Sequence, residues 1–369
     1  MKKAFCAHVK RDPVLWISGI LAAGTAFIVP PSAAYMEYID IRTLALLFSL
    51  MAVVCALSRK GLLDAVAGCF VRRAHSRRGL GVMLVLLCYV SSMLITNDVA
   101  LITFVPLALI LMRDDSRSMM LTVVLQTVAA NLGSMMTPFG NPQNLFLYSA
   151  YSMTGRDFFA AVLPVGLVSL FAVLALCLLL PRKPLAVRTN PAGISIRLDA
   201  VIYLLGMLFL LCVAAVLRFV SYPVTAIAVV LMLLIIDRQA LKKVDYPLLI
   251  TFCFFFVFVG NLGKMEAVKN LLDRLLEGRE VLVSAVASQF ISNVPAALML
   301  CEFTDNGNAL ITGTNIGGLG TLIASMASLI SFKLYCRAEG AEVRKYLSVF
   351  TWMNFGLLGF LLILAEAVL

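Results

Sequence analysis

The chain has 369 residues, of which 62% are hydrophobic and only 14% are charged. Soluble domains do not have this composition, so it predicts a polytopic membrane protein that contacts lipid. The formal net charge is +10, but Lys and Arg lie mostly in short loops between apolar segments, as the positive-inside rule describes. Nucleic acid is therefore not an expected partner. The nine cysteines occur singly, without a Cys-x-x-Cys motif, which is typical of small packing residues.

The N-terminal half of the chain, residues 1–181, begins with a basic segment and an apolar span near 13–30. No small-residue cleavage site follows this span, so we expect a retained first helix with a cytoplasmic N-terminus. The later apolar run of about 80–112 is short for two membrane crossings and long for one. It predicts a re-entrant helical hairpin, open to the cytoplasm, whose tip carries Thr96, Asn97 and Asp98.

The segment of about 119–150 could cross a membrane as one helix, but two prolines and two glycines interrupt its middle. Proline removes a backbone donor and clashes with the preceding turn, so we expect the helix to break between Thr137 and Pro142. Broken backbone survives inside hydrocarbon only where protein or a water-filled cavity satisfies it. The break is therefore a candidate ligand site, with the residues Asn131, Thr137, Gly140 and Asn141.

The C-terminal half repeats this order. Residues 182–198 form a basic cytoplasmic linker, and residues 199–369 contain a second apolar run of about 281–304 and a second broken helix of about 308–332. The middle of the second run is Ser292-Asn293. The second break aligns with the first position by position, so that Asn315, Thr321 and Ser325 correspond to Asn131, Thr137 and Asn141.

Loop charge supports a hairpin in each half. With both apolar runs treated as hairpins, 23 of the 30 Lys and Arg residues fall on the cytoplasmic side. Treating either run as a single crossing moves a basic loop outside, against the positive-inside rule. The second hairpin then opens to the exterior. We therefore predict an all-α polytopic membrane protein of two inverted-topology repeats, each with a re-entrant helical hairpin and a broken transmembrane helix.

Paired helix interruptions are typical of the binding site of a secondary transporter. The other interpretation is that glycine-rich patches only let membrane helices pack closely, which does not require the shared amides and hydroxyls. Helix N-termini carry about half a positive charge and can hold an anion without a buried Lys or Arg. Carbonyls at the opposite helix ends could coordinate Na⁺. The candidate substrate- and ion-binding residues are Thr96, Asn97, Asp98, Asn131, Thr137, Gly140, Asn141, Ser292, Asn293, Asn315, Thr321 and Ser325.

Asp98 is the one acidic residue at a predicted hairpin tip. An ionised carboxylate at bilayer depth costs at least about 2.5 kcal/mol, so it is a functional candidate. It could ligate Na⁺ or carry a proton, or it could cap the second arm of the hairpin. The second half has Val294 at this position, so the two tips are not chemically equivalent.

The two tips and the paired Asn-x-Gly-x-x-x-Thr stretches resemble the ion transporter superfamily. That group holds the arsenite efflux permeases, related sodium/proton antiporters, and the divalent anion:sodium symporters that carry citrate and dicarboxylates. The resemblance covers roughly residues 41–367 and looks closest to bacterial permeases described as anion or citrate carriers. It implies a small anionic substrate between tips and breaks, homodimers and elevator-type motion, with Na⁺ sites at Thr96, Asn97, Ser292 and Asn293.

The chain departs from the symporters of this superfamily at both tips. They typically have Ser-Asn-Thr, where this chain has Thr96-Asn97-Asp98 and Ser292-Asn293-Val294. The Asn97-Asp98 pair is similar to one in arsenite permeases, which favours a proton-linked or oxyanion substrate.

The leading hypothesis is a secondary active transporter in a bacterial-type cytoplasmic membrane. It would move a small anion, either a carboxylate or an inorganic oxyanion, by alternating access coupled to Na⁺ or H⁺. The alternative is a Na⁺/H⁺ antiporter or an arsenite-type efflux permease that uses Asp98. We expect no enzyme, because the sequence has no catalytic Asp pair and no His-Glu-x-x-His motif, and no cofactor other than Na⁺ as a coupling ion.

Overall fold

The structure is a computed structural model that describes residues 13–71, 74, 76–184 and 200–368. In these ranges the chain is all-α and has no strand, apart from one isolated bridge between Ser76 and Pro184. The prediction of an all-α polytopic protein is therefore confirmed. Most of the predicted linker, 182–198, lies outside the described residues.

The helices of the first half differ from the predicted spans mainly at their ends. The first one stops at Ala26, four residues before the predicted end at Pro30. The bounds are α2 (Pro13–Ala26), α3 (Ala34–Tyr38), α4 (Ile41–Arg59), α5 (Leu62–Val71), α6 (Arg77–Ile95), α7 (Asn97–Leu111), α8 (Ser116–Ser134), α9 (Pro142–Ala150), α10 (Gly155–Leu176) and the 3-10 helix η1 (Cys177–Leu179).

The second half has more short helices than the first. The bounds are α11 (Ala200–Val216), α12 (Tyr222–Ile236), α13 (Arg238–Lys242), α14 (Tyr246–Gly263), α15 (Glu266–Leu276), α16 (Glu280–Ile291), α17 (Asn293–Leu300), the 3-10 helix η2 (Cys301–Phe303), α18 (Gly307–Ile316), α19 (Met326–Cys336) and α20 (Val343–Val368).

Local sequence explains where many of these helices begin. A side-chain oxygen accepts a hydrogen bond from the first turn and satisfies a backbone donor that has no partner inside the helix. Thr154 and Asp157 form a reciprocal capping box at the start of α10. The other capping side chains of this kind are Asp40, Ser76, Asp115, Asn141, Asp237, Asp245 and Asn306.

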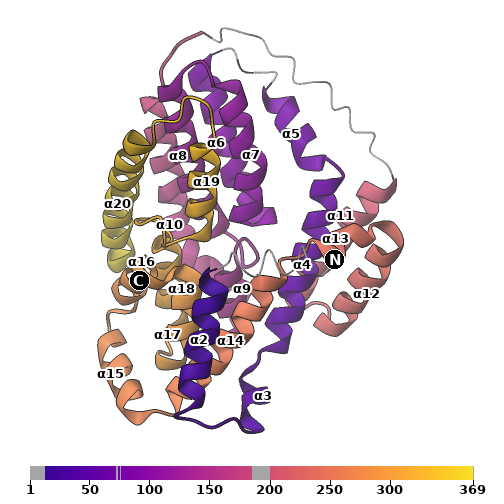
Figure 1. Ribbon diagram of the computed structural model, residues 1–369, viewed down its shortest axis with the longest axis vertical. Coiled ribbons are helices and arrows are strands. Elements are labelled where there is room, and N and C mark those ends of the chain that lie inside the picture. Colours follow the sequence, from indigo (N-terminus) through magenta and orange to yellow (C-terminus); the bar gives the residue numbers. More distant parts are fainter. Residues whose placement is uncertain (1–12, 72–73, 75, 185–199, 369) are drawn as a thin grey trace.

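The helices form two packed groups. In Figure 1, α6, α7, α8 and α19 stand side by side in the upper part with α20 along one edge, while α2, α14, α15 and α17 occupy the lower part. One buried cluster joins α6, α7 and α8 to α19 and α20, and a second joins α4, α9, α11, α14, α17 and α18. Both clusters therefore mix residues from the two halves, and the broken helices lie where the groups meet.

At each predicted hairpin tip, one residue has a positive φ and separates the two helices. Thr96, between α6 and α7, has φ 76° and ψ 151°, and Ser292, between α16 and α17, has φ 72° and ψ 154°. L-residues rarely adopt positive φ, so the same unusual conformation at aligned positions indicates a shared local design. The arms differ in length, because α6 has 19 residues and is long enough to cross a membrane, whereas α16 has 12.

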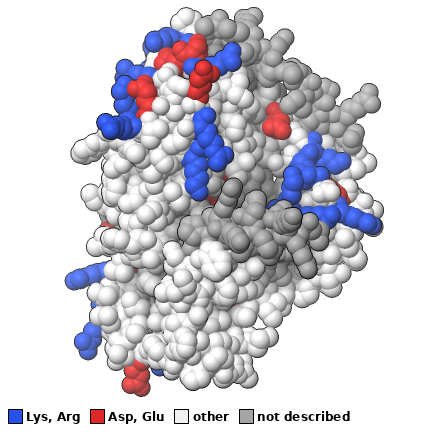
Figure 2. All heavy atoms as spheres, in the orientation of Figure 1, with Lys and Arg blue, Asp and Glu red and all other residues white. Residues whose placement is uncertain are grey.

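Composition fits a membrane environment over much of the surface. Among the described residues, the helices long and apolar enough to cross a membrane are α4, α6, the 155–179 segment, α14 and α20. Figure 2 shows Lys and Arg gathered toward the upper end and at one edge of the molecule, with a largely uncharged body on this face. Exposed apolar side chains such as Trp16, Phe171 and Ile363 suit contact with lipid.

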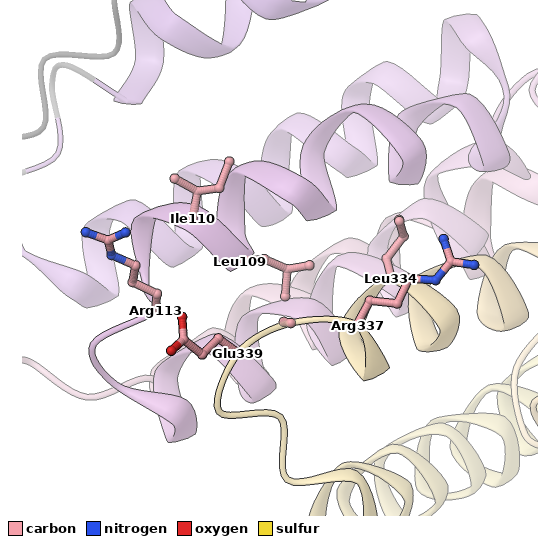
Figure 3. Close-up of a pocket in the computed structure, with 7 residues that line it drawn as sticks. Leu109, Ile110, Arg113, Leu334, Arg337 and Glu339 are labelled. Carbon is pink, nitrogen blue, oxygen red and sulfur yellow. The ribbon is translucent and has the colours of Figure 1, made fainter.

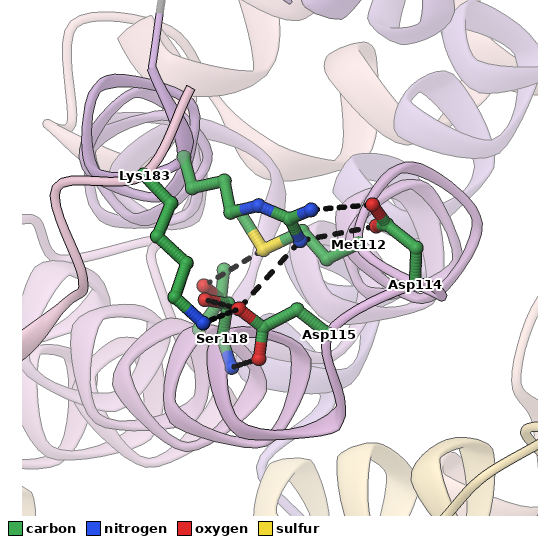
Figure 4. A network of polar contacts seen from close by, with 7 residues as sticks. Met112, Asp114, Asp115, Ser118 and Lys183 are labelled. Atoms are coloured by element: carbon green, nitrogen blue, oxygen red, sulfur yellow. Dashed lines mark hydrogen bonds and ion pairs between the residues drawn. The ribbon is translucent and has the colours of Figure 1, made fainter. Parts of the chain in front are cut away.

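A charged network fixes the upper rim of the first half (Figure 4). Arg77, at the start of α6, donates to both carboxylate oxygens of Asp114 and lies 3.7 Å from Asp115. Lys183 approaches Asp115 at 3.4 Å, and Asp115 also caps α8 through Ser118. The network ties the start of α6 and the residues after η1 to the turn between α7 and α8.

We predict that Arg77→Ala lowers the free energy of unfolding by about 1–3 kcal/mol, because the nearly buried guanidinium donates both hydrogen bonds to Asp114 and is also close to Asp115. The hydrogen bond from Arg77 lowers the pKa of Asp114 from its ordinary value. The pair therefore stabilises the protein above that ordinary pKa, and the difference from the variant should fade as the pH falls through the lowered value. Thermal unfolding in detergent at several pH values measures this.

The matched control is Lys345→Ala, which removes an exposed ion pair with Glu342. An exposed pair contributes little. Equal losses for the two variants would show that the rim network has no special weight.

Candidate functional site

Both broken helices contain a segment without regular helix. α8 ends at Ser134 and α9 begins at Pro142, and we call residues 135–141 the first interruption. α18 ends at Ile316 and α19 begins at Met326, and residues 317–325 are the second interruption. Each interruption contains or adjoins the candidate residues that the sequence indicates, and nearly all of these side chains are buried.

Asn315, at the end of α18, joins the second interruption to the first. Its Oδ1 accepts a hydrogen bond of 2.9 Å from Nδ2 of Asn141, and its Nδ2 donates to Oδ1 of Asn144 at 2.5 Å. Asn141 also caps α9 by accepting from the backbone N–H of Asn144. One amide of the second half therefore holds the start of α9 in the first half.

Asn131, near the end of α8, makes the reciprocal connection. Its Oδ1 accepts from Oγ of Ser325 at 2.9 Å, and its Nδ2 donates to Oγ of Ser328 at 3.3 Å. In the alignment of the halves, Ser325 corresponds to Asn141 and Ser328 to Asn144. Each half thus presents an Asn to the same two positions of the other half. We call this set of side chains the cross-clamp: Asn131, Asn141, Asn144, Asn315, Ser325 and Ser328.

Amide groups also satisfy the carbonyls of the interruptions. In the first interruption, Nδ2 of Asn144 lies 3.0–3.4 Å from the backbone oxygens of Ser134, Met135 and Thr137. In the second, Nε2 of Gln289 reaches the oxygens of Gly317 and Leu319, and Nδ2 of Asn131 reaches that of Gly318. Broken backbone at membrane depth needs such partners, and here side chains supply them.

The hairpins contact the interruptions in the same way in both halves. Thr137 donates to the carbonyl of Met93 on α6, and Thr321 donates to that of Gln289 on α16. When the tips Asn97 and Asn293 are aligned, Met93 and Gln289 occupy equivalent positions. Gly133 and Gly317 also pack equivalently, since a Cβ at either would lie within 3 Å of the first arm of its own hairpin.

The tip residues are less fully paired than the cross-clamp. Nδ2 of Asn97 donates to Asn131 at 3.2 Å, and the backbone N–H of Asn293 donates to the carbonyl of Ala324 at 2.9 Å. The Oδ1 atom of Asp98 is buried and has no hydrogen-bond partner within the described part of the chain. Neither Thr96 nor Ser292 caps the helix that follows it. Polar capacity for a ligand therefore remains at the tips.

The sequence missed the residues that complete this arrangement. Gln289 lies within the predicted apolar run of about 281–304 and Asn144 within the first broken helix, but neither is among the candidate residues. A polar residue three positions before a Ser-Asn tip is the signal that could have identified Gln289. Gly140 brings no side chain to the site, because a Cβ there would lie 2.1 Å from the carbonyl of Ser134; its contribution is close backbone packing.

A surface recess lies away from these residues (Figure 3). Its volume is about 290 Å³, and its lining comes from the ends of α7 and α19 with the loops that follow them, including Arg113, Arg337 and Glu339. None of the candidate site residues lines it, so we place the site on the interruptions. Within the described residues, no group of three His, Cys, Asp or Glu side chains is placed to hold a metal ion.

Comparison with known proteins identifies the family. The family model described as citrate transporter, CitMHS, matches residues 7–306. The chain belongs to this citrate transporter family. An uncharacterized transporter of Methanocaldococcus jannaschii is 32% identical over 300 residues, which cover 80% of this chain and 81% of that protein. The chain is therefore a multi-pass membrane transporter and not an enzyme.

Two further relatives are membrane proteins by name. The inner membrane protein YbiR of Escherichia coli is 27% identical over 339 residues, covering 90% of this chain and 91% of that protein. A 46 kDa membrane protein of Mycobacterium leprae is 24% identical over 340 residues, covering 80% and 79%.

We predict that Asn315→Ala lowers the free energy of unfolding by about 2–4 kcal/mol, since it removes the donor to the buried Oδ1 of Asn144 and one acceptor of the buried Nδ2 of Asn141. A double-mutant cycle between Asn141 and Asn315 should give a coupling energy of about 0.5–3 kcal/mol, because the two residues bond directly. Thermal or denaturant unfolding of the purified variants measures both quantities.

Asn354→Ala is the matched control. Asn354 is also fully buried, but its amide donates to the carbonyl of Phe350 in its own helix. Paired with Asn141, it should show no coupling. Additive losses for Asn141 and Asn315 would contradict the cross-clamp.

Proposed function

We propose that this transporter moves a small anion, a carboxylate or an inorganic oxyanion, across the cytoplasmic membrane, coupled to Na⁺ or H⁺. The observation that carries the proposal is the meeting of two hairpin tips and two interrupted helices at one polar junction. α17 and α19 begin there without a side-chain cap, and the hydroxyl of Ser325, the residue before α19, donates to Asn131 of the other half. Uncapped helix N-termini attract anions.

Alternating access is supported by the reciprocal bonding of the two halves. Asn141 with Asn315 and Ser325 with Asn131 are equivalent pairs with the halves exchanged, which is what a two-fold relation between repeats produces. In Figure 1 the hairpin α6–α7 lies in the upper part and α17 in the lower part. We propose inverted repeats with a cytoplasmic N-terminus, and assembly as a homodimer. We place the protein in a bacterial-type inner membrane because YbiR, its relative in Escherichia coli, is named an inner membrane protein.

The alternative function is a Na⁺/H⁺ antiporter or an arsenite-type efflux permease. Asp98 favours it, because a carboxylate oxygen is buried at the first tip without a hydrogen-bond partner in the described part of the chain. Such an oxygen can accept a proton or ligate Na⁺. The absence of a second acid at Val294 limits this alternative to one carboxylate.

Reconstituted liposomes separate the two functions. We expect uptake of a labelled anion, tested with citrate, succinate, sulfate and arsenite, that depends on an imposed Na⁺ or H⁺ gradient. A pH change on addition of Na⁺ with no anion present would identify the antiporter instead. Absence of both signals in protein that is folded and correctly inserted would overturn the proposal.

At the hairpin tips, we predict that Asn97→Ala and Asn293→Ala each reduce uptake at least about tenfold while leaving expression intact. The physical reason is that each substitution removes a side-chain amide at a tip that retains hydrogen-bonding capacity for a ligand. Gln126→Ala, in the buried face of α8, is the control for packing. Normal uptake by both tip variants would place the substrate elsewhere.

For the coupling ion, we predict that Asp98→Asn changes the dependence of transport on pH or Na⁺, because the amide keeps the shape but cannot carry the charge. Initial rates across a range of pH and Na⁺ concentrations measure the effect. An unchanged profile with an unchanged rate would reduce Asp98 to a structural residue.

A further inference from the structure

Gln289 lies at an unusual meeting of carbonyl oxygens. Its Nε2 atom is 2.9 Å from the oxygen of Gly317, 3.0 Å from that of Leu319 and 3.0 Å from that of Ala285. A side-chain amide has two hydrogens, so three acceptors around one nitrogen exceed what it can serve with linear bonds. Three oxygens around a single point are a cation-like environment.

The partners of Gln289 fix the orientation of its amide. Oε1 accepts a hydrogen bond of 2.9 Å from the backbone N–H of Thr321. A flipped amide would turn a donor toward this N–H and an oxygen toward the three carbonyls, so the nitrogen must face the carbonyls. The close approach requires Gly320, which has φ +101° and whose Cβ would lie 2.2 Å from Oε1.

Two of these oxygens, those of Gly317 and Leu319, come from the C-terminal end of α18 and the backbone just after it, whereas that of Ala285 lies one turn back in α16 itself. Carbonyls at the C-terminal ends of broken helices carry partial negative charge and coordinate Na⁺ in secondary transporters. Here an amide nitrogen of the protein's own hairpin is bonded to two of them.

In the first half, the carbonyls of the interruption have a different donor. Met93 and Met136 stand at the positions of Gln289 and Gly320, so no amide reaches the first interruption from its hairpin arm. Asn144, on the broken helix itself, holds those carbonyls instead. Among the described residues, it is therefore only in the second half that an amide on a hairpin arm donates to carbonyls of the interruption.

We propose that Gln289 takes the place of a cation in the second interruption, so that this half closes on its hairpin without a coupling ion. What this implies for ion coupling rests on the proposed function: the second half would contribute to anion binding but would not hold a coupling Na⁺. The structural claim is only that the amide of Gln289, and not a cation, interacts with the carbonyls of Gly317 and Leu319.

The test compares thermal unfolding of the purified protein in Na⁺ with unfolding in N-methylglucamine at equal ionic strength. Gln289→Ala empties the position, and Gln289→Met places there the residue of the first half. In N-methylglucamine each variant should unfold at least about 2 °C below wild type. Na⁺ should raise the unfolding temperature of each variant by more than it raises that of wild type, because the carbonyls of Gly317 and Leu319 then lack their amide donor and can coordinate the ion.

Gln126→Ala is the matched control, because Gln126 is a buried glutamine whose amide donates to a helix carbonyl, that of Phe104, outside either interruption. Its loss of stability should be the same in both salts. An equal Na⁺ response in wild type and both Gln289 variants would overturn the proposal. So would a smaller response in the variants, or failure of both to fold in Na⁺. None of these readouts requires transport, so they remain separate from the uptake test.

Discussion

Two broken helices hold each other through side-chain amides, and the rest of the structure depends on this contact. Asn131, near the end of α8, reaches the start of α19, and Asn315, at the end of α18, reaches the start of α9. Without Asn131 and Asn144 of the cross-clamp, carbonyls of the interruptions would lose their donors at membrane depth, at a cost of several kcal/mol each. The hairpin tips can lie against the interruptions because the cross-clamp supplies hydrogen-bond partners to the polar groups inside the junction.

This arrangement divides the candidate residues by task. Those of the cross-clamp have their hydrogen-bonding groups occupied by one another, so their first contribution is to hold the junction together. The tips keep groups that are not used in this way, and the buried oxygen of Asp98 is the clearest example. The sequence has no Lys or Arg at these positions. An anion would therefore be held by the tips and the helix N-termini, without a buried cation.

The sequence predicted much of the fold because its signals are local. Pro138 and Pro142 locate the first interruption, and the alignment of Asn131 with Asn315 locates the second. The predicted hairpin of about 80–112 corresponds to α6 and α7, but apolar composition alone does not show that the 19-residue α6 is long enough for a full crossing. The cross-clamp pairs and Gln289 were missed, since they depend on contacts between residues 28–197 positions apart in the chain.

Hydrogen–deuterium exchange of the protein in lipid nanodiscs tests the central claim most directly. Loops usually exchange quickly, but amides in 135–141 and 317–325 should be protected, because each segment is held by side chains of the other half. Asn315→Ala should then speed exchange in 135–141, a segment of the opposite half. Fast exchange of both segments in the wild-type protein, or an effect of the variant confined to 317–325, would contradict the account.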